Sequence, residues 1–353
     1  MNNRNLTLEA FRGLFILYMI IHHFDYYFMD QIPHFTEAMK KLFYEGFVGV
    51  NFFFMLSGFG CVMGYKKRLV SGEITQLQFL KNRIFNLWPT YLLLLIAAVF
   101  IYNLKFTSIH FFEHVFMIQA WMVSGKSVFC YNAAAWCVSA CMFFYVVYCF
   151  IYKMNFKISL AVSCLFSLYI LINILSYGSY TGSLPYLFYT NPLFRCLEFV
   201  VGMTIALYIQ EYKTFASVKL QWISIFVMIG AIFIGTYSGI PLYWRWSLYY
   251  LLPCALLILA FSGETSFSQK LFNHKWLQEI AKISMVIYLV HQEIINGLKL
   301  WLPESIKLLY FKYFIPFGAI GVILLSIFVS FIIHKFYTKP ISNLLKNMKF
   351  NRR

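Results

Sequence analysis

Charged residues are scarce in this sequence of 353 residues, and acidic residues are fewer than basic ones. Asp, Glu, Lys and Arg make up 12% of the chain, against about 25% in ordinary soluble domains. Hydrophobic residues make up 61% and aromatic residues 21%, which leaves too few polar side chains to cover a surface that faces water. The composition excludes a soluble domain, a disordered chain and a coiled coil. It predicts an all-α polytopic membrane protein.

Metal-binding cysteine pairs and the common nucleotide and hydrolase motifs are also missing. The eight cysteines form no CxxC pair, so neither a zinc site nor a disulfide framework is expected. A Walker loop, a nucleophile elbow and an HExxH helix are absent, which removes support for an ATPase, a hydrolase or a zinc protease. We expect no metal and no permanently bound cofactor.

Apolar runs long enough to cross a bilayer, about 20 residues each, recur along the whole chain. We predict about ten transmembrane helices, at approximately 11–29, 46–64, 88–104, 133–152, 158–176, 194–210, 220–238, 245–262, 283–300 and 314–336. Most Lys and Arg lie between these runs on the side of the N-terminus, which places both termini in the cytoplasm. The aromatic stretch 106–124 contains ionisable residues and is expected to be interfacial or re-entrant.

The net charge of +16 is spread over short segments between apolar runs. No basic helix face alternates with stacking aromatic residues, so the expected partners are the lipid bilayer and an anionic substrate, and not nucleic acid. No internal repeat or appended soluble domain is evident. Residues 1–353 are expected to form a single integral-membrane domain in a cell membrane.

Ionisable residues inside a span point to function because they are costly there. Arg12 and His23 both lie in the first span, and eleven residues turn a helix through about three full turns. The two side chains therefore share one face, with Arg12 at the cytoplasmic mouth and His23 deeper, while His22 points about 100° away. A cation at the mouth suits a phosphate, and a neutral imidazole can accept a proton from a hydroxyl.

Simpler roles for these residues remain open. Arg12 can extend to the inner interface, and His23 can bond to a neighbouring carbonyl group. Asp25 either orients His23 or is solvated near the outer interface. Arg195 and Glu198, three residues apart, are expected to pair. Tyr288 and His291 share one helix face, where they either line an acceptor cavity or bond to each other.

Two further groups stand out. A basic group, expected to lie in one cytoplasmic loop, has enough charge for a nucleotide diphosphate or reflects topology alone; it comprises Lys66, Lys67, Arg68, Lys81 and Arg83. Small residues in the second span are spaced for close helix packing; they are Gly46, Gly49, Ser57 and Gly58.

Several segments together resemble the membrane acyltransferase 3 family, which includes bacterial polysaccharide O-acetyltransferases. The segment LEAFRGLFILYMIIHHF at 8–24 resembles the first span of the family, and GFVGVNFFFMLSGF at 46–59 is the most specific match. Four further segments are similar: FLKNRIFNLWPTY at 79–91, WCVSACMFFY at 136–145, FRCLEFVVGM at 194–203 and ISMVIYLVH at 283–291. The resemblance covers almost the whole chain.

The resemblance implies a ten-span transferase that takes an acyl group from cytoplasmic acyl-CoA to an outward-facing hydroxyl. It implies His23 as the catalytic residue and Arg12 and Arg83 as contacts for the donor phosphates, with Lys81 as a further candidate. An acceptor cavity would be shaped by residues of later spans: Trp136, Tyr145, Arg195, Glu198, Tyr288 and His291. Two positions depart from the family pattern, since Asn86 replaces an arginine and Cys141 replaces a glutamate.

The sequence therefore favours an O-acyltransferase, in particular an O-acetyltransferase, that modifies a surface or exported polysaccharide in the cytoplasmic membrane of a bacterium. Acetyl-CoA or another acyl-CoA would be the donor, a glycan or glycolipid the acceptor, and polysaccharide assembly proteins its neighbours. The alternative is a transporter or flippase of a glycan or lipid intermediate.

Overall fold

The computed structural model describes residues 5–28, 41, 43–177, 186–213 and 216–348, and these residues form helices and no strand. The first half comprises α1 (Leu6–Phe28), α3 (Val48–Cys61), η2 (Val62–Lys66), α4 (Lys67–Val70), α5 (Gln76–Ile101), α6 (Ile109–Val115), η3 (Gln119–Trp121), α7 (Gly125–Phe129), α8 (Trp136–Ile151) and α9 (Phe156–Tyr177). The second half comprises α10 (Leu187–Thr190), α11 (Pro192–Tyr212), α12 (Val218–Tyr237), α13 (Leu242–Trp244), η5 (Arg245–Tyr249), α14 (Leu251–Phe261), α15 (Ser266–Phe272), α16 (Lys275–Lys282), α17 (Ser284–Trp301), α18 (Glu304–Ile333), η6 (His334–Thr338) and α19 (Lys339–Asn347).

Within the described ranges, seven helical segments are long and apolar enough to cross a membrane. They are Val48–Val70, Gln76–Ile101, Phe156–Tyr177, Leu187–Tyr212, Val218–Tyr237, Leu242–Phe261 and Gly318–Asn347. Each of the ten predicted ranges contains a helix, and the other three ranges correspond to α1, α8 and α17. The chain is an all-α multi-pass membrane protein. Between α5 and α8 lie only short helices, as predicted for the stretch 106–124.

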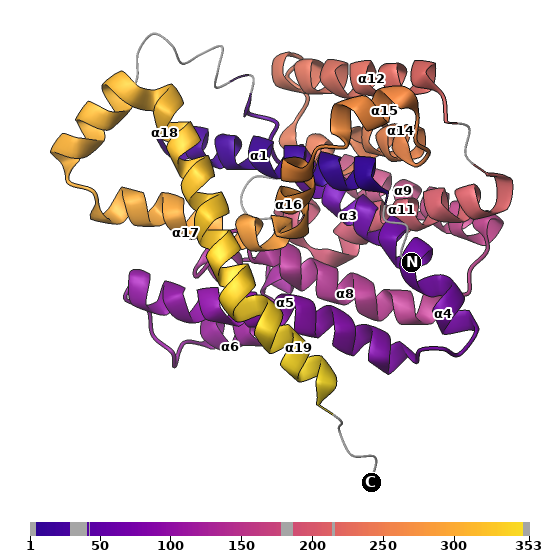
Figure 1. Cartoon of the computed structure of the whole chain (residues 1–353), viewed down its shortest axis with the longest axis horizontal. Helices are drawn as coiled ribbons and strands as arrows, with labels where there is room; N and C mark the ends of the chain where they lie inside the picture. The colour runs from indigo at the N-terminus through magenta and orange to yellow at the C-terminus, as the bar shows by residue number, and fades with distance from the viewer. Residues whose placement is uncertain (1–4, 29–40, 42, 178–185, 214–215, 349–353) are drawn as a thin grey trace.

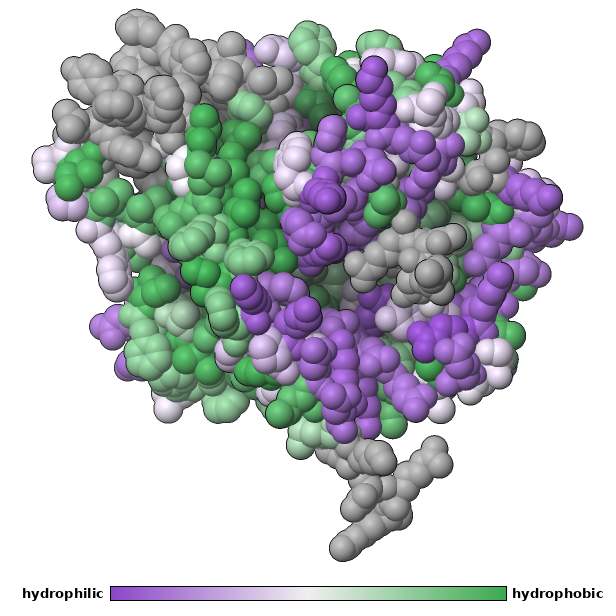
Figure 2. Space-filling model, viewed as in Figure 1, coloured by the Kyte–Doolittle hydropathy of each residue, from purple (hydrophilic) through white to green (hydrophobic). Residues whose placement is uncertain are grey.

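The helices form a bundle in which α3, α5, α8 and α11 pack together, while α18 crosses in front of α1 and α17, and α19 continues over α5 (Figure 1). Outward-facing residues of α9, α12 and α18 are large and apolar, among them Leu165, Phe226 and Phe328. Figure 2 shows the molecule from the same side as Figure 1. Apolar residues lie around α18, while hydrophilic residues gather over α16 and α19. An apolar exterior of this kind is stable in lipid, where no water penalises it.

The loop predicted to carry all five cations is shorter than expected. Thr75 accepts a bond from the Gln78 backbone while the Gln78 side chain accepts one from Thr75, a reciprocal cap that starts α5 at Gln76. Lys81 and Arg83 therefore lie in the first turns of a helix, and Lys66, Lys67 and Arg68 lie in η2 and α4, so none of the five lies in the loop. The predicted third span, which starts near residue 88, falls on the apolar part of this helix, and the polar cap extends the helix back to Gln76.

Glycine contacts hold the centre of the bundle together. A Cβ atom added at Gly58 of α3 would lie 1.9 Å from the Phe199 carbonyl oxygen of α11, and one at Gly202 would lie 1.8 Å from that of Met55. The two backbones meet at these positions, which confirms the close packing predicted for the second span. A Cβ atom added at Gly46 would lie 2.3 Å from His22 Cβ of α1, and one at Gly49 would lie 2.9 Å from Met19 Cε.

Replacing Gly58 by alanine should therefore destabilise the protein, because the added methyl group forces α3 and α11 apart. Overpacking of this kind costs about 1–3 kcal/mol or more. Thermal unfolding of the purified protein in lipid nanodiscs measures the effect. Gly60→Ala is the matched control, since no atom lies within 4 Å of a Cβ at that position. Equal melting temperatures for the two variants would contradict the close approach.

Candidate active site

Helix α1 positions both polar residues predicted for the first span. It packs against α3, α16 and α17, and the residues between Arg12 and His23 are largely buried and apolar, including Phe15, Ile16 and Ile20. This packing fixes the helix about its own axis. The two polar side chains are therefore held at different depths of the bundle.

His23 meets a second histidine that is distant in the sequence. Its Nδ1 lies 2.8 Å from Nε2 of His291 on α17, and the rings are stacked with centroids 5.0 Å apart. His291 Nδ1 in turn lies 3.2 Å from the Ile287 carbonyl oxygen, and the Tyr288 ring is 5.8 Å away. His22 points elsewhere, with its Nδ1 2.9 Å from the Phe43 carbonyl oxygen. The structure thus separates the two adjacent histidines, as the helix geometry predicted.

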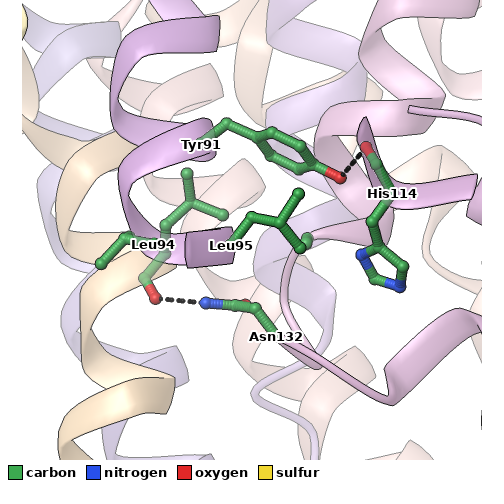
Figure 3. Close-up of a pocket in the computed structure, with 7 residues that line it drawn as sticks. Tyr91, Leu94, Leu95, His114 and Asn132 are labelled. Atoms are coloured by element: carbon green, nitrogen blue, oxygen red, sulfur yellow. Dashed lines mark hydrogen bonds between the residues drawn. The ribbon is translucent and has the colours of Figure 1, made fainter. Parts of the chain in front are cut away.

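A polar contact on the far side of α17 holds that helix in place. Asn132 Nδ2 donates to the Leu289 carbonyl oxygen at 2.9 Å, and Tyr91 donates to the His114 carbonyl oxygen at 2.7 Å. Figure 3 shows these bonds around a cavity of about 10 Å³ that Leu289 also lines. A cavity of this size accommodates about one water molecule. The bond from Asn132 to Leu289 helps to hold α17, the helix that carries His291. The cavity itself is too small for an acceptor substrate.

Arg12 lies near a larger pocket at the start of α1. Its Nη1 pairs with Glu9 at 3.1 Å, and about a third of its side chain is exposed. Glu9 also lines a pocket of about 330 Å³, together with Leu6, Asn273, Lys275, Gln278, Glu279 and Lys282. This volume is within the range of ligand sites. The pocket is lined by two lysines, two carboxylates and two amide side chains, which suits a polar group.

Arg83 occupies an aromatic cage between α5, α8 and η2. Its guanidinium carbon lies 4.5 Å from the Tyr65 ring centroid, 5.5 Å from that of Phe79 and 5.1 Å from that of Tyr145. Its Nη2 contacts Cys61 Sγ at 3.7 Å, and its buried Nε has no hydrogen-bond partner. Among the described residues, no hydrogen bond links the site around Arg83 to Arg12. Lys81 lies two residues before Arg83, about half a helical turn away, and is half-buried.

A cation that the sequence interpretation missed lies beside Asn86, one turn after Arg83. Asn86 Oδ1 accepts bonds from Lys346 Nζ and from Ser342 Oγ of α19. The Thr90 and Thr338 hydroxyl groups, 2.6 Å apart, fasten α5 to η6. The position where the family has an arginine thus receives a positive charge from the C-terminal helix. The alternation of polar and apolar residues over 339–347 is the only sequence signal for this contact.

Arg195 and Glu198 are fully buried and pair at 3.1 Å, as their spacing predicted. Arg195 also donates to the Trp246 carbonyl oxygen and, at 3.1 Å, to Asn51 Oδ1. This network joins α3, α11 and η5 within the core. The aromatic candidates are packed in the core too: Trp136 contacts Phe54 and Tyr189.

The other predicted site residues on α8 also have packing partners. Tyr145 accepts a bond from Ser57 at 3.3 Å and covers Arg83, and Cys141 is buried. The side chain of Asp25 lies outside the described residues. Of the predicted site residues, the structure therefore brings together His23, His291 and Tyr288 in one place and Arg83 and Tyr145 in another.

Comparisons with known proteins identify the family of the chain. A family model described as an acyltransferase domain matches residues 5–335. The chain is also 34% identical, over 100 residues, to "Protein 2 in picA locus" of Rhizobium radiobacter; the match covers 28% of this chain and 47% of that relative, about half of its length. No solved structure matches. Because the family model covers nearly the whole chain, this protein belongs to the acyltransferase 3 family.

Proposed function

We propose that this protein is an O-acyltransferase, specifically an O-acetyltransferase, that moves an acyl group from cytoplasmic acyl-CoA to a hydroxyl of a surface or exported glycan. The observation that carries the proposal is the histidine pair. His23 lies inside the bundle with its Nδ1 bonded to His291, on the same helix as the cation Arg12. Membership of an acyltransferase family makes acyl transfer the reaction that such a buried base serves.

The reaction needs one base and two bond changes. An unprotonated ring nitrogen of His23 takes the proton of the acceptor hydroxyl, whose oxygen attacks the thioester carbonyl. The new C–O bond forms as the C–S bond breaks, and the CoA thiolate leaves and takes the proton from His23. The products are an O-acyl ester and free CoA, with the histidine returned to its starting state.

The donor would be held at two places on the cytoplasmic side. Arg12 and the adjoining pocket suit a phosphate-bearing group, because arginine and lysine bind phosphate through charge-assisted hydrogen bonds. Arg83 supplies a second cation with an unpaired Nε, supported by Lys81 and by Lys346 beside Asn86. The proposal places the protein in the cytoplasmic membrane of a bacterium, beside the machinery that assembles the polysaccharide.

The test is the release of free CoA by the purified protein in native lipid, with acetyl-CoA as donor and host membrane extract as the acceptor source. Acceptor-dependent release, with the acetyl group recovered as an alkali-labile ester, is the expected result. Binding of CoA without release, over a series of acyl chains and glycan fractions, would contradict the transfer. A protein that binds no CoA and yet changes the flux of a glycolipid would instead be a transporter.

Replacing Arg12 by alanine should raise the apparent KM for acyl-CoA about 10- to 100-fold, with little change in the KM for the acceptor. The loss of a hydrogen bond to a charged group, about 1.5–3 kcal/mol, corresponds to this range. Initial rates at varied donor and acceptor concentrations separate the two constants. Arg68→Ala is the control, because Arg68 pairs with Glu73 on the surface. Unchanged donor dependence in the Arg12 variant would rule out this role.

A further inference from the structure

The bonding of His291 determines which nitrogen of His23 carries the proton. A backbone carbonyl oxygen can only accept a hydrogen bond, so His291 Nδ1, 3.2 Å from the Ile287 carbonyl oxygen, must carry a hydrogen and donate it. In a neutral imidazole the other nitrogen then has a lone pair. His291 Nε2 is therefore an acceptor.

The same logic extends to the next ring. His23 Nδ1 lies 2.8 Å from the accepting His291 Nε2, so His23 Nδ1 must carry a hydrogen and donate it. The lone pair of neutral His23 is then on Nε2. The opposite arrangement would place the lone pair of His291 Nδ1 against the lone pairs of a carbonyl oxygen inside the protein, where an unmatched polar group is costly.

We infer that His291 is a positioning residue that fixes His23 as the Nδ1–H tautomer and thereby makes Nε2 the nitrogen that takes the acceptor proton. This inference rests on the proposed function for its chemical meaning. The chain of bonds runs from the Ile287 carbonyl oxygen through His291 to His23, and it joins α17 to α1. A neutral histidine here does the orienting work that a carboxylate often does for a catalytic histidine.

The pair also accommodates the proton that the reaction transfers. When Nε2 takes the acceptor proton, His23 becomes an imidazolium whose Nδ1–H still donates to His291. The bond becomes charge-assisted and stronger, and neither ring needs to rotate. His291 keeps its own proton throughout, so only His23 Nε2 gains and loses one in each cycle.

Variants at position 291 separate this role from simple packing. His291→Gln places a carbonyl oxygen near the former Nε2, where it can still accept from His23, and should retain most of kcat. His291→Phe keeps a ring but has no acceptor, and should lose kcat about 10²-fold or more, within the range that general-base catalysis contributes. The KM for acyl-CoA should change little in either variant. His22→Asn, which retains a donor to the Phe43 carbonyl oxygen, should behave as the wild type.

Nitrogen NMR of the protein labelled with ¹⁵N-histidine, in lipid, reads the tautomer directly, with the His23 signal identified by its loss in His23→Gln. The expected spectrum shows a protonated Nδ1 and a bare Nε2, and a shift toward the opposite tautomer in His291→Phe. A bare Nδ1 in the wild type would overturn the inference even where CoA release is normal. Because the spectrum needs no turnover, a failure of the proposed function would leave this test of the tautomer intact. Equal kcat in the Gln and Phe variants would also overturn it.

Discussion

Replacing His23 by alanine is expected to lower the rate of acyl transfer about 10²- to 10⁴-fold, the contribution that general acid–base catalysis typically makes. The two neighbouring histidines do not replace His23 on the same path: His22 bonds to the Phe43 carbonyl oxygen, and the lone pair of His291 Nε2 faces His23 Nδ1, not the nitrogen that meets the acceptor. The measurement is CoA release by wild type and variant in the same lipid at saturating acyl-CoA.

Binding of the donor should survive the change. Arg12, its partner Glu9 and the adjoining pocket lie at the other end of α1 from His23. Because substitutions at distant sites act nearly independently, the Kd for CoA should stay within about two- to threefold of the wild type. Loss of kcat with retained binding would identify His23 as a group that acts in the chemical step. Full activity in His23→Ala would refute the mechanism, and loss of binding together with activity would point to misfolding.

The second large effect is expected in the buried ion pair. Arg195→Met should destabilise the protein by about 3–5 kcal/mol, because it leaves the Glu198 carboxylate buried without its partner. Asn51 Oδ1 loses its donor as well, and the Trp246 carbonyl oxygen keeps only the bond from Asn51 Nδ2. Thermal unfolding in nanodiscs should show a large fall in melting temperature, and little folded protein should be recovered from membranes.

A double variant and a surface pair control this experiment. Arg195→Met combined with Glu198→Leu removes both charges and should recover part of the lost stability, since an apolar pair of similar volume often replaces a buried ion pair well. Arg68→Ala breaks a pair whose side chains are 43% and 58% exposed and should cost no more than about 1 kcal/mol. A double variant less stable than Arg195→Met alone would show that the network matters beyond the removal of an unpaired charge.

The ten helical ranges, the close packing of the second span and the Arg195–Glu198 pair could be predicted because each depends on local spacing. Helix periodicity also placed Arg12 and His23 on one face and turned His22 away. The start of α5 lies well before the apolar run because a polar capping box, and not hydrophobicity, sets it. The sequence contained this signal in Thr75 and Gln78, but a search for apolar runs passes over it.

The sequence by itself determined that the chain is a bundle of membrane helices, because composition and apolar length decide what lipid accepts, and it identified some of the ionisable residues inside that bundle. Only the tertiary structure decided how they meet. His23 and His291 are 268 positions apart and Asn86 and Lys346 are 260 apart, and no local pattern links residues on different helices. Those contacts depend on how the helices pack, which glycines such as Gly58 and Gly202 control by letting two backbones touch.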